Sequence, residues 1–213
     1  MNMKNVSRCL LFFSSLLFLK GVAAQEPTAP DVLVKNVTLE VVEIIAKDKE
    51  IRSGDRAKLI SVIDAKVLPH FNFASMTALA MGQNWRAATP EQKRQLVDAF
   101  RTLLVRTYAS ALAAYSEQKF DFRPLRAKPS DTDVMVQVRV LQPGAQPVPI
   151  DYAMEKTAAG WKVYDVMVGG VSLVANYRTE FATVVRNSSI DGLIKDLQAK
   201  NRTLEQRSLE QKK

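Results

Sequence analysis

The sequence predicts an α+β domain: a curved, four-stranded antiparallel meander sheet packed on one face by helices from both the N- and C-terminal parts of the chain. Two changes in the spacing of apolar residues predict this class. Apolar residues recur at helical spacing up to about residue 116, alternate singly between residues 120 and 168, and return to helical spacing from residue 172. Helices, then a meander, then helices again are typical of α+β domains.

The first 24 residues have the features of a cleavable export signal. Lys4 and Arg8 precede an apolar run over residues 10–19, and Val22-Ala23-Ala24 supplies the small residues of a cleavage site. The run is half of the ~20 residues that a membrane-spanning helix needs, so a cleaved signal is favoured over an anchor. Cys9 precedes the run, whereas a lipidated cysteine would follow it.

Removal of this signal changes the composition. It holds three of the 30 basic residues and none of the 22 acidic ones, so the net charge falls from +8 to +5. The single cysteine leaves with it, and the remaining chain must be held by its core alone. The basic excess suits an anionic surface or acidic partners, and it is too diffuse to indicate nucleic-acid binding.

The mature chain divides into a short linker, one domain and a tail. We expect residues 25–30 to be the linker, residues 31–200 a single domain, and residues 201–213 a polar tail that is frayed.

Helical spacing predicts the helices. The first covers residues 31–45, where β-branched residues make a strand the alternative, and the second ends at Pro69. Thr89, Pro90 and Gln92 form a capping-box pattern that predicts a helix to about residue 116. Two helices close the domain, over residues 172–187 and from residue 191 to about 200.

Single alternation predicts four strands, separated by short connectors rich in Pro and Gly. They are centred on Phe120 and Phe122, on Val134 to Val140, on Val148 to Met154, and on Trp161 to Val168.

Few residues in the mature chain have the chemistry of catalysis. Without cysteine, thiol catalysis and cysteine-ligated zinc are excluded, and we expect no metal or cofactor. His70 follows a helix-ending proline with no nucleophile-elbow sequence nearby, which favours a helix-end role over a Ser-His-Asp triad. Asp151 and Asp165 on neighbouring strands form the one carboxylate pair suited to acid–base work. Alternation directs Asp151 away from the apolar face, so a structural role is favoured.

The apolar surplus has two interpretations, a filled core or a cavity, and composition does not separate them. Methionines and aromatic residues suit adaptable apolar pockets.

Several runs resemble the MlaC, or toluene-tolerance auxiliary, family. They occur in order over about residues 31–200: MGQNWR (81–86), ATPEQ (88–92), FRTLLVRTY (100–108), PIDY (149–152), GWKVYDV (160–166), GVSLV (170–174), and NYR (176–178) with Phe181. Gly169 departs from the pattern, because the family has an acid before the GVSLV run.

The resemblance implies a soluble periplasmic phospholipid carrier and not an enzyme. Such a carrier shuttles lipid between an outer-membrane lipoprotein–porin complex and an inner-membrane ABC transporter with an MCE-domain protein, and so maintains outer-membrane lipid asymmetry. A shuttle with two docking partners is more naturally a monomer. A periplasmic lipoprotein chaperone and a hydrolase that uses the aspartate pair are the alternatives.

On this basis we expect the acyl chains to lie between the inward face of the sheet and the helices. The expected contacts are Phe73, Met76, Leu79, Phe100, Leu104, Tyr108, Leu112, Val134, Val136, Val138, Tyr152, Met154, Val174, Tyr177 and Phe181. Arg106 and Arg178 are candidates for the mouth of the pocket, whereas Trp85 and Trp161 are expected to stabilise the fold. A strand register shifted by one residue would reverse the facing of the sheet residues.

Overall fold

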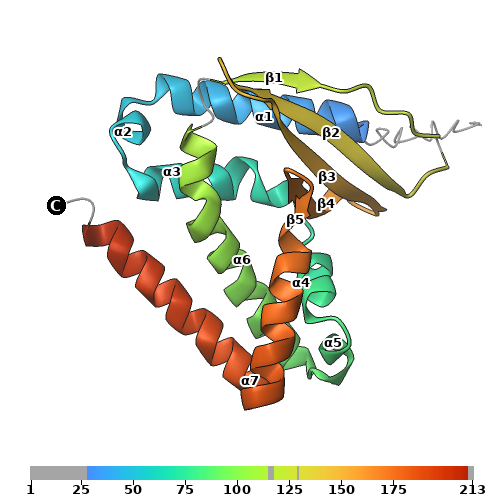
Figure 1. The fold of residues 1–213 in the computed structure, drawn as a ribbon, viewed down its shortest axis with the longest axis vertical. Helices are drawn as coiled ribbons and strands as arrows, with labels where there is room; N and C mark the ends of the chain where they lie inside the picture. Colours follow the sequence, from blue (N-terminus) through green and yellow to red (C-terminus); the bar gives the residue numbers. More distant parts are fainter. Residues whose placement is uncertain (1–27, 115–117, 129, 211–213) are drawn as a thin grey trace, which may run out of the picture.

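The structure is a computed structural model that describes residues 28–114, 118–128 and 130–210. Helices precede a five-stranded sheet, and a long bent helix follows it (Figure 1). The helical elements are α1 (Pro30–Lys47), α2 (Lys49–Arg52), α3 (Arg56–Lys66), the 3-10 turn η1 (Leu68–His70), α4 (Phe73–Met81), α5 (Asn84–Ala87), α6 (Pro90–Ala114) and α7 (Leu173–Glu210). The strands are β1 (Lys119–Phe122), β2 (Asp133–Leu141), β3 (Val148–Thr157), β4 (Gly160–Val168) and β5 (Val171–Ser172). The predicted export signal and residues 25–27 of the predicted linker lie outside the described residues.

The sheet is an antiparallel meander in the order β1-β2-β3-β4-β5. Along β2 buried and exposed residues alternate strictly, and Val136 lies opposite Tyr152 on β3. The predicted α+β class and the facing of the β2 valines are therefore confirmed. The sheet has one strand more than predicted, because Gly169 and Gly170, both at positive φ, turn the chain directly into β5.

A bulge between β3 and β4 explains the curvature of the sheet. Ala153 pairs with Asp165 and Met154 pairs with Val163, so Tyr164 is an extra residue on β4. In an unbroken strand, residues 163 and 166 would face opposite sides of the sheet. The extra residue lets both valines be buried on the inner face and adds local twist.

The predicted capping box is present at the start of α6. The Gln92 backbone N–H donates to Thr89 Oγ1 at 3.2 Å, and the Thr89 N–H donates to Gln92 Oε1 at 3.0 Å. The pair satisfies two N–H groups that the first turn of a helix leaves unpaired.

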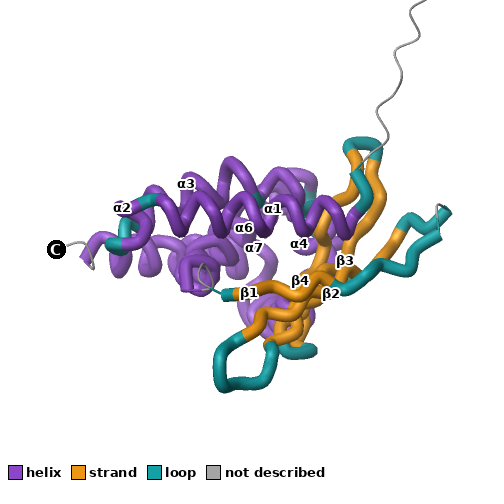
Figure 2. The backbone as a smooth tube through the Cα atoms, turned by 90° about the horizontal axis from the view of Figure 1, so that it is seen from above, coloured by secondary structure: helices purple, strands orange, loops and turns teal. Residues whose placement is uncertain are grey.

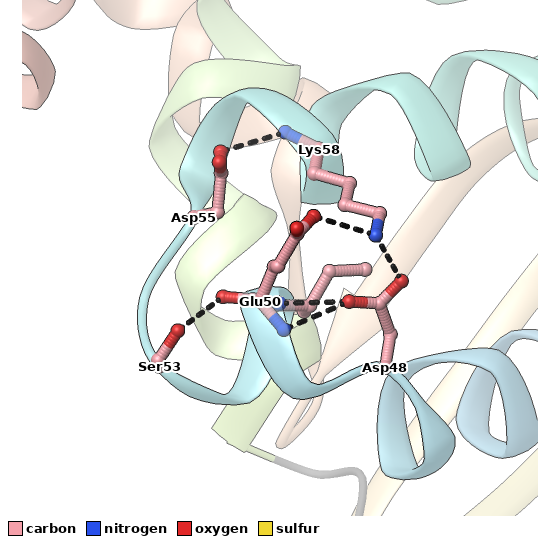
Figure 3. A network of polar contacts seen from close by, with 6 residues as sticks. Asp48, Glu50, Ser53, Asp55 and Lys58 are labelled. Atoms are coloured by element: carbon pink, nitrogen blue, oxygen red, sulfur yellow. Dashed lines mark hydrogen bonds and ion pairs between the residues drawn. The ribbon is translucent and has the colours of Figure 1, made fainter.

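The corner between α1 and α3 is held by a polar network (Figure 3). Asp48 accepts hydrogen bonds from the N–H groups of Glu50 and Ile51, and Asp55 accepts one from the N–H of Lys58. Lys58 Nζ lies 2.6 Å from Asp48 and 2.7 Å from Glu50. These contacts position α1 and α3 as neighbours. The helix over Pro30–Lys47 confirms helix over strand for the first segment.

Helix α7 is broken at Ser188 and Ser189, where the chain turns back (Figure 1). Ser189 has φ +70° and ψ 176°, a conformation that glycine adopts far more readily. Beyond the break the helix packs on α6, and the amide of Asn201 donates to the Ala99 carbonyl at 2.9 Å. The frayed tail predicted from residue 201 is wrong as far as Glu210, because this packing continues the helix.

Within the described part of the chain, the buried apolar residues form three separate clusters. One joins α4, α6 and both halves of α7, a second joins the sheet to Val34 of α1, and a third joins α1, α2, α3 and Ala109 of α6. A domain of this size more commonly has one contiguous core. Across the described ranges, no helix has the length and apolar character required to cross a membrane.

Candidate functional site: an apolar cavity

A cavity of about 520 Å³ lies where the three clusters meet. Figure 2 shows the strands gathered at one side of the molecule and α1 reaching from the helical side across to them. The 3-10 turn region joins the edge of the sheet, because the Asn72 N–H donates to the Val163 carbonyl at 2.8 Å. The cavity is therefore bounded by the inner face of the sheet and by the helices that precede and follow it.

Helix α1 contributes six of the eighteen residues of the helical wall. Its lining positions fall at residues 33, 34, 37, 38, 41 and 42, which is the repeat of one helical face. The rest of this wall comes from α3 to α4 and from α6. The lining residues of the wall are Leu33, Val34, Val37, Thr38, Val41, Val42, Ile63, Val67, Leu68, His70, Phe71, Phe73, Met76, Leu104, Val105, Tyr108, Ala109 and Ala111.

The opposite wall is the inner face of the sheet together with the start of α7. The strand residues in this wall follow the cross-strand pairs Ile150–Val168, Tyr152–Val166 and Met154–Val163. The complete set is Phe120, Ile150, Tyr152, Met154, Val163, Val166, Val168, Val171, Leu173 and Asn176.

The cavity opens beside the turn between β4 and β5. Val168 and Val171 are 38% and 53% exposed and also belong to the lining. Ala111 on α6 and Asn176 on α7 are likewise both exposed and part of the lining. The apolar surface thus runs without a break from the interior to the outside of the molecule.

Few polar groups face the cavity, and none of the described lining side chains is an acid, a lysine or an arginine. Burial, reinforced by the charge of Lys162 and opposed by Glu40, lowers the pKa of His70, so its neutral form is favoured. Burial also raises the pKa of Tyr152 to about 12. The arrangement favours a ligand whose enclosed part is uncharged and largely hydrocarbon.

Six of the fifteen predicted contacts lie in the cavity wall: Phe73, Met76, Leu104, Tyr108, Tyr152 and Met154. Their role as lipid contacts stays a prediction. Phe100, Val174, Tyr177 and Phe181 pack together among the helices instead, with ring centroids of Phe100 and Phe181 5.1 Å apart. Their apolar spacing predicts burial, and these four residues lie in the packed core between the helices and not in the cavity wall.

The other predicted contacts lie elsewhere. Val134, Val136 and Val138 face inward as expected, but they are buried in the sheet cluster with Val34 of α1. Leu79 is 38% exposed and is not part of the lining. The side chain of Leu112 lies outside what the structure describes.

Neither arginine proposed for the mouth belongs to the lining. Arg106 donates to the Asn201 carbonyl and lies 3.2 Å from Glu205, so it fastens α6 to α7. Arg178 Nε donates to the Leu79 carbonyl at 3.0 Å and links α7 to α4. Trp161 is buried in the cluster that joins the sheet to Val34, and Trp85 packs against the cluster that joins α4, α6 and α7.

The sequence-based prediction missed the wall formed by α1 and the turn η1. The sequence does contain the pattern of the α1 wall, because α1 carries a mainly apolar stripe two residues wide that continues for three turns. A helix that only docks on a sheet would show the same stripe. Only the arrangement of the other elements reveals that this stripe borders a cavity.

The aspartate pair faces away from the cavity. Asp151 alternates with Ile150 and Tyr152, which line it, and Asp165 precedes the lining residue Val166. Asp165 accepts hydrogen bonds from the N–H groups of Val166 and Val174, at 2.8 and 3.2 Å, and is therefore part of the connection between β4 and α7. This position supports a structural role.

The fold and the cavity define an α+β protein built around one continuous apolar site. The chain belongs to the MlaC family, because the family model described as "MlaC protein" matches residues 35–199.

The chain is similar to several known proteins, among them two curated relatives and one solved structure. The chain is 24% identical to the intermembrane phospholipid transport system binding protein MlaC of Haemophilus influenzae, over 89% of this chain and 90% of that one. It is 25% identical to the toluene tolerance protein ttg2D of Pseudomonas putida, over 86% of this chain and 84% of that one. A solved structure of the phospholipid-binding protein from Ralstonia solanacearum, in complex with a phospholipid, is 39% identical, with a TM-score of 0.76 over 82% of this chain and 98% of that one.

Proposed function

We propose that the protein is a phospholipid carrier of the periplasm. The observation that carries the proposal is the apolar cavity of about 520 Å³, open at one end beside Val168 and Val171. The phospholipid complex of the Ralstonia relative and the transport system named for the Haemophilus relative support the same ligand and role. The protein acts by holding lipid and performs no catalysis.

The cavity meets the main energetic requirement of such a carrier. Each methylene removed from water contributes ~0.8 kcal/mol, so moving the roughly thirty methylenes of two acyl chains through water would cost on the order of 20 kcal/mol. A wall whose described side chains carry no charge removes that cost for the hydrocarbon that it encloses, and an open mouth leaves the headgroup in water.

The carrier moves between two membrane complexes in this proposal. Its partners are an outer-membrane lipoprotein–porin complex and an inner-membrane ABC transporter with an MCE-domain protein, and their joint role is outer-membrane lipid asymmetry. The sequence of residues 1–24 supports export, and the absence of a cysteine after its apolar run supports release in a form free to diffuse. The carrier docks transiently, as a monomer.

A cavity-filling variant and a matched surface variant test whether phospholipid occupies the cavity. Val37 lies in the α1 wall, and Asn36 next to it is exposed. We expect protein purified from cells to release phospholipid on organic extraction, V37W to release several-fold less per mole of folded protein, and N36W to match the wild type. Equal release from all three proteins would place the lipid outside the cavity.

The same extraction separates the two alternatives. A lipoprotein chaperone would copurify with an acylated polypeptide instead of free phospholipid. A hydrolase that uses the aspartate pair would release cleaved products such as lysophospholipid and fatty acid, and D151N/D165N would abolish them. The orientation of both aspartates away from the cavity weighs against this second outcome.

A further inference from the structure

The hydroxyl of Tyr152 is a polar group without a protein partner in an apolar wall. Tyr152 lies on the central strand β3, between Val136 on β2 and Val166 on β4, and belongs to the cavity lining. Within the described ranges, no side chain or backbone group forms a hydrogen bond with its Oη, and its surroundings perturb it by burial alone. Oη has accessible surface, and Tyr152 as a whole is half-buried. Because Tyr152 belongs to the cavity lining, this accessible surface faces the cavity.

The other described tyrosines differ in this respect. Besides burial, Asp133 contributes to raising the pKa of Tyr164 and Tyr108 contributes to raising that of Tyr177, whereas burial alone raises the pKa of Tyr152. Buried tyrosine hydroxyls normally have a hydrogen-bond partner, so a ligand that displaces water from the Tyr152 hydroxyl must supply a partner in its place. A partner supplied by the ligand would satisfy Tyr152.

The position of Tyr152 along the strand identifies the part of the ligand that it meets. The pair Ile150–Val168 lies at the rim, because Val168 is exposed, and Tyr152–Val166 is the next pair inward on the same face. Two residues of a strand span ~7 Å. In a glycerophospholipid whose phosphate stays at the mouth, the ester carbonyls follow a few covalent bonds further in, at a similar depth. They are also the last polar atoms before the hydrocarbon chains.

We propose that the Tyr152 hydroxyl donates a hydrogen bond to an acyl-ester carbonyl oxygen of the bound phospholipid. This contact sets the depth at which the lipid lies and makes the site selective for ester-linked over ether-linked lipids. The inference rests on the proposed carrier function. An ether oxygen is a weaker acceptor than a carbonyl oxygen, so one hydrogen bond of ordinary net strength gives a preference of roughly three- to tenfold.

Competitive loading tests the proposal. Purified protein is exchanged with an equimolar mixture of diester and diether phosphatidylethanolamine of the same chain length, and the bound lipids are quantified by mass spectrometry after re-isolation. We expect the wild type to retain the diester form several-fold more than the diether form, and Y152F to retain both equally. Y164F is the matched control, because it removes a tyrosine hydroxyl outside the cavity lining, and it should keep the wild-type ratio.

Infrared spectra of bound lipid with ¹³C-labelled ester carbonyls provide a second readout. The carbonyl band should lie at lower frequency in the wild type than in Y152F. Equal retention of both lipids by the wild type, or an unchanged preference in Y152F, would overturn the role of Tyr152 while leaving the carrier function intact. Failure of every variant to bind either lipid would instead overturn the carrier function.

Discussion

Asp165 on β4 accepts a hydrogen bond of 2.5 Å from the hydroxyl of Ser172, the residue that precedes α7. The same hydroxyl accepts a bond from the N–H of Ala175 at 2.9 Å, so Ser172 caps the helix while Asp165 holds the cap. Because this connection lies beside the mouth of the cavity, it fixes the start of α7 relative to the sheet.

Substitution of Asp165 should therefore destabilise the protein. D165A removes the acceptor of three hydrogen bonds, so we expect the free energy of unfolding to fall by about 1–3 kcal/mol in urea denaturation. D151A is the control, because Asp151 lies on the same face of the sheet and accepts no hydrogen bond within the described part of the chain; its unfolding should be within ~0.5 kcal/mol of the wild type. Equal effects of the two changes would contradict the capping role.

Alkaline pH should destabilise the fold through Tyr152. Burial raises the pKa of this hydroxyl to about 12, from an ordinary value of 10.0 that applies to the unfolded chain. Below pH 10 the Tyr152 hydroxyl is protonated in both the folded and the unfolded chain, so its ionisation does not lower the stability of the fold. As the pH rises from 10 towards 12, the unfolded chain loses its proton first, so stability falls by on the order of 2–3 kcal/mol.

Urea denaturation between pH 9 and 12 measures this effect. Y152F should lose less stability than the wild type over this interval. The remaining loss comes from Tyr164 and Tyr177, because burial contributes most to raising the pKa of each to about 12 as well, and from Lys58 and Lys200, because their acidic neighbours raise the pKa of both lysines. Parallel curves for the wild type and Y152F would mean that Tyr152 is not shielded from water.

Loading with a diacyl lipid should widen the cavity. If a methylene fills about the ~30 Å³ that a water molecule occupies in the liquid, 520 Å³ holds on the order of one acyl chain. Two chains therefore require α1 and the sheet to separate, which breaks the packing of Val34 on the sheet and leaves the cluster of α1, α2 and α3 intact.

Spin-label distances report such a movement directly. The chain beyond residue 24 has no cysteine, so K35C on α1 and K156C on β3 provide a unique pair at exposed positions in protein that starts at residue 25. We expect the distance between the two labels to increase on loading, whereas R52C and S61C, within the corner of α2 and α3, should keep theirs. An unchanged α1–β3 distance at full loading would show that the cavity already has its final size.

Much of the fold follows from local patterns in the sequence. The capping box of Thr89 and Gln92 locates the start of α6, and single alternation gives both the extent and the facing of β2. These features depend on residues close in sequence, where periodicity and hydrogen-bonding chemistry are decisive.

The limits of the prediction have equally specific causes. The bulge at Tyr164 exists because two valines three residues apart are both buried, which single alternation does not anticipate. Helix α7 extends past residue 201 because Asn201 bonds to α6, a contact between residues far apart in sequence. The same limitation applies to the site: Phe100 and Val37 have similar apolar spacing, yet one lies in solid core and the other borders the cavity.

Native mass spectrometry of the protein isolated from the periplasm tests the central claim most directly. We predict a folded monomer whose mass exceeds that of the chain from residue 25 by one diacyl phospholipid, and whose added mass is lost in V37W but kept in N36W. A folded wild-type monomer that carries no lipid, or one that carries an acylated polypeptide, would contradict the account.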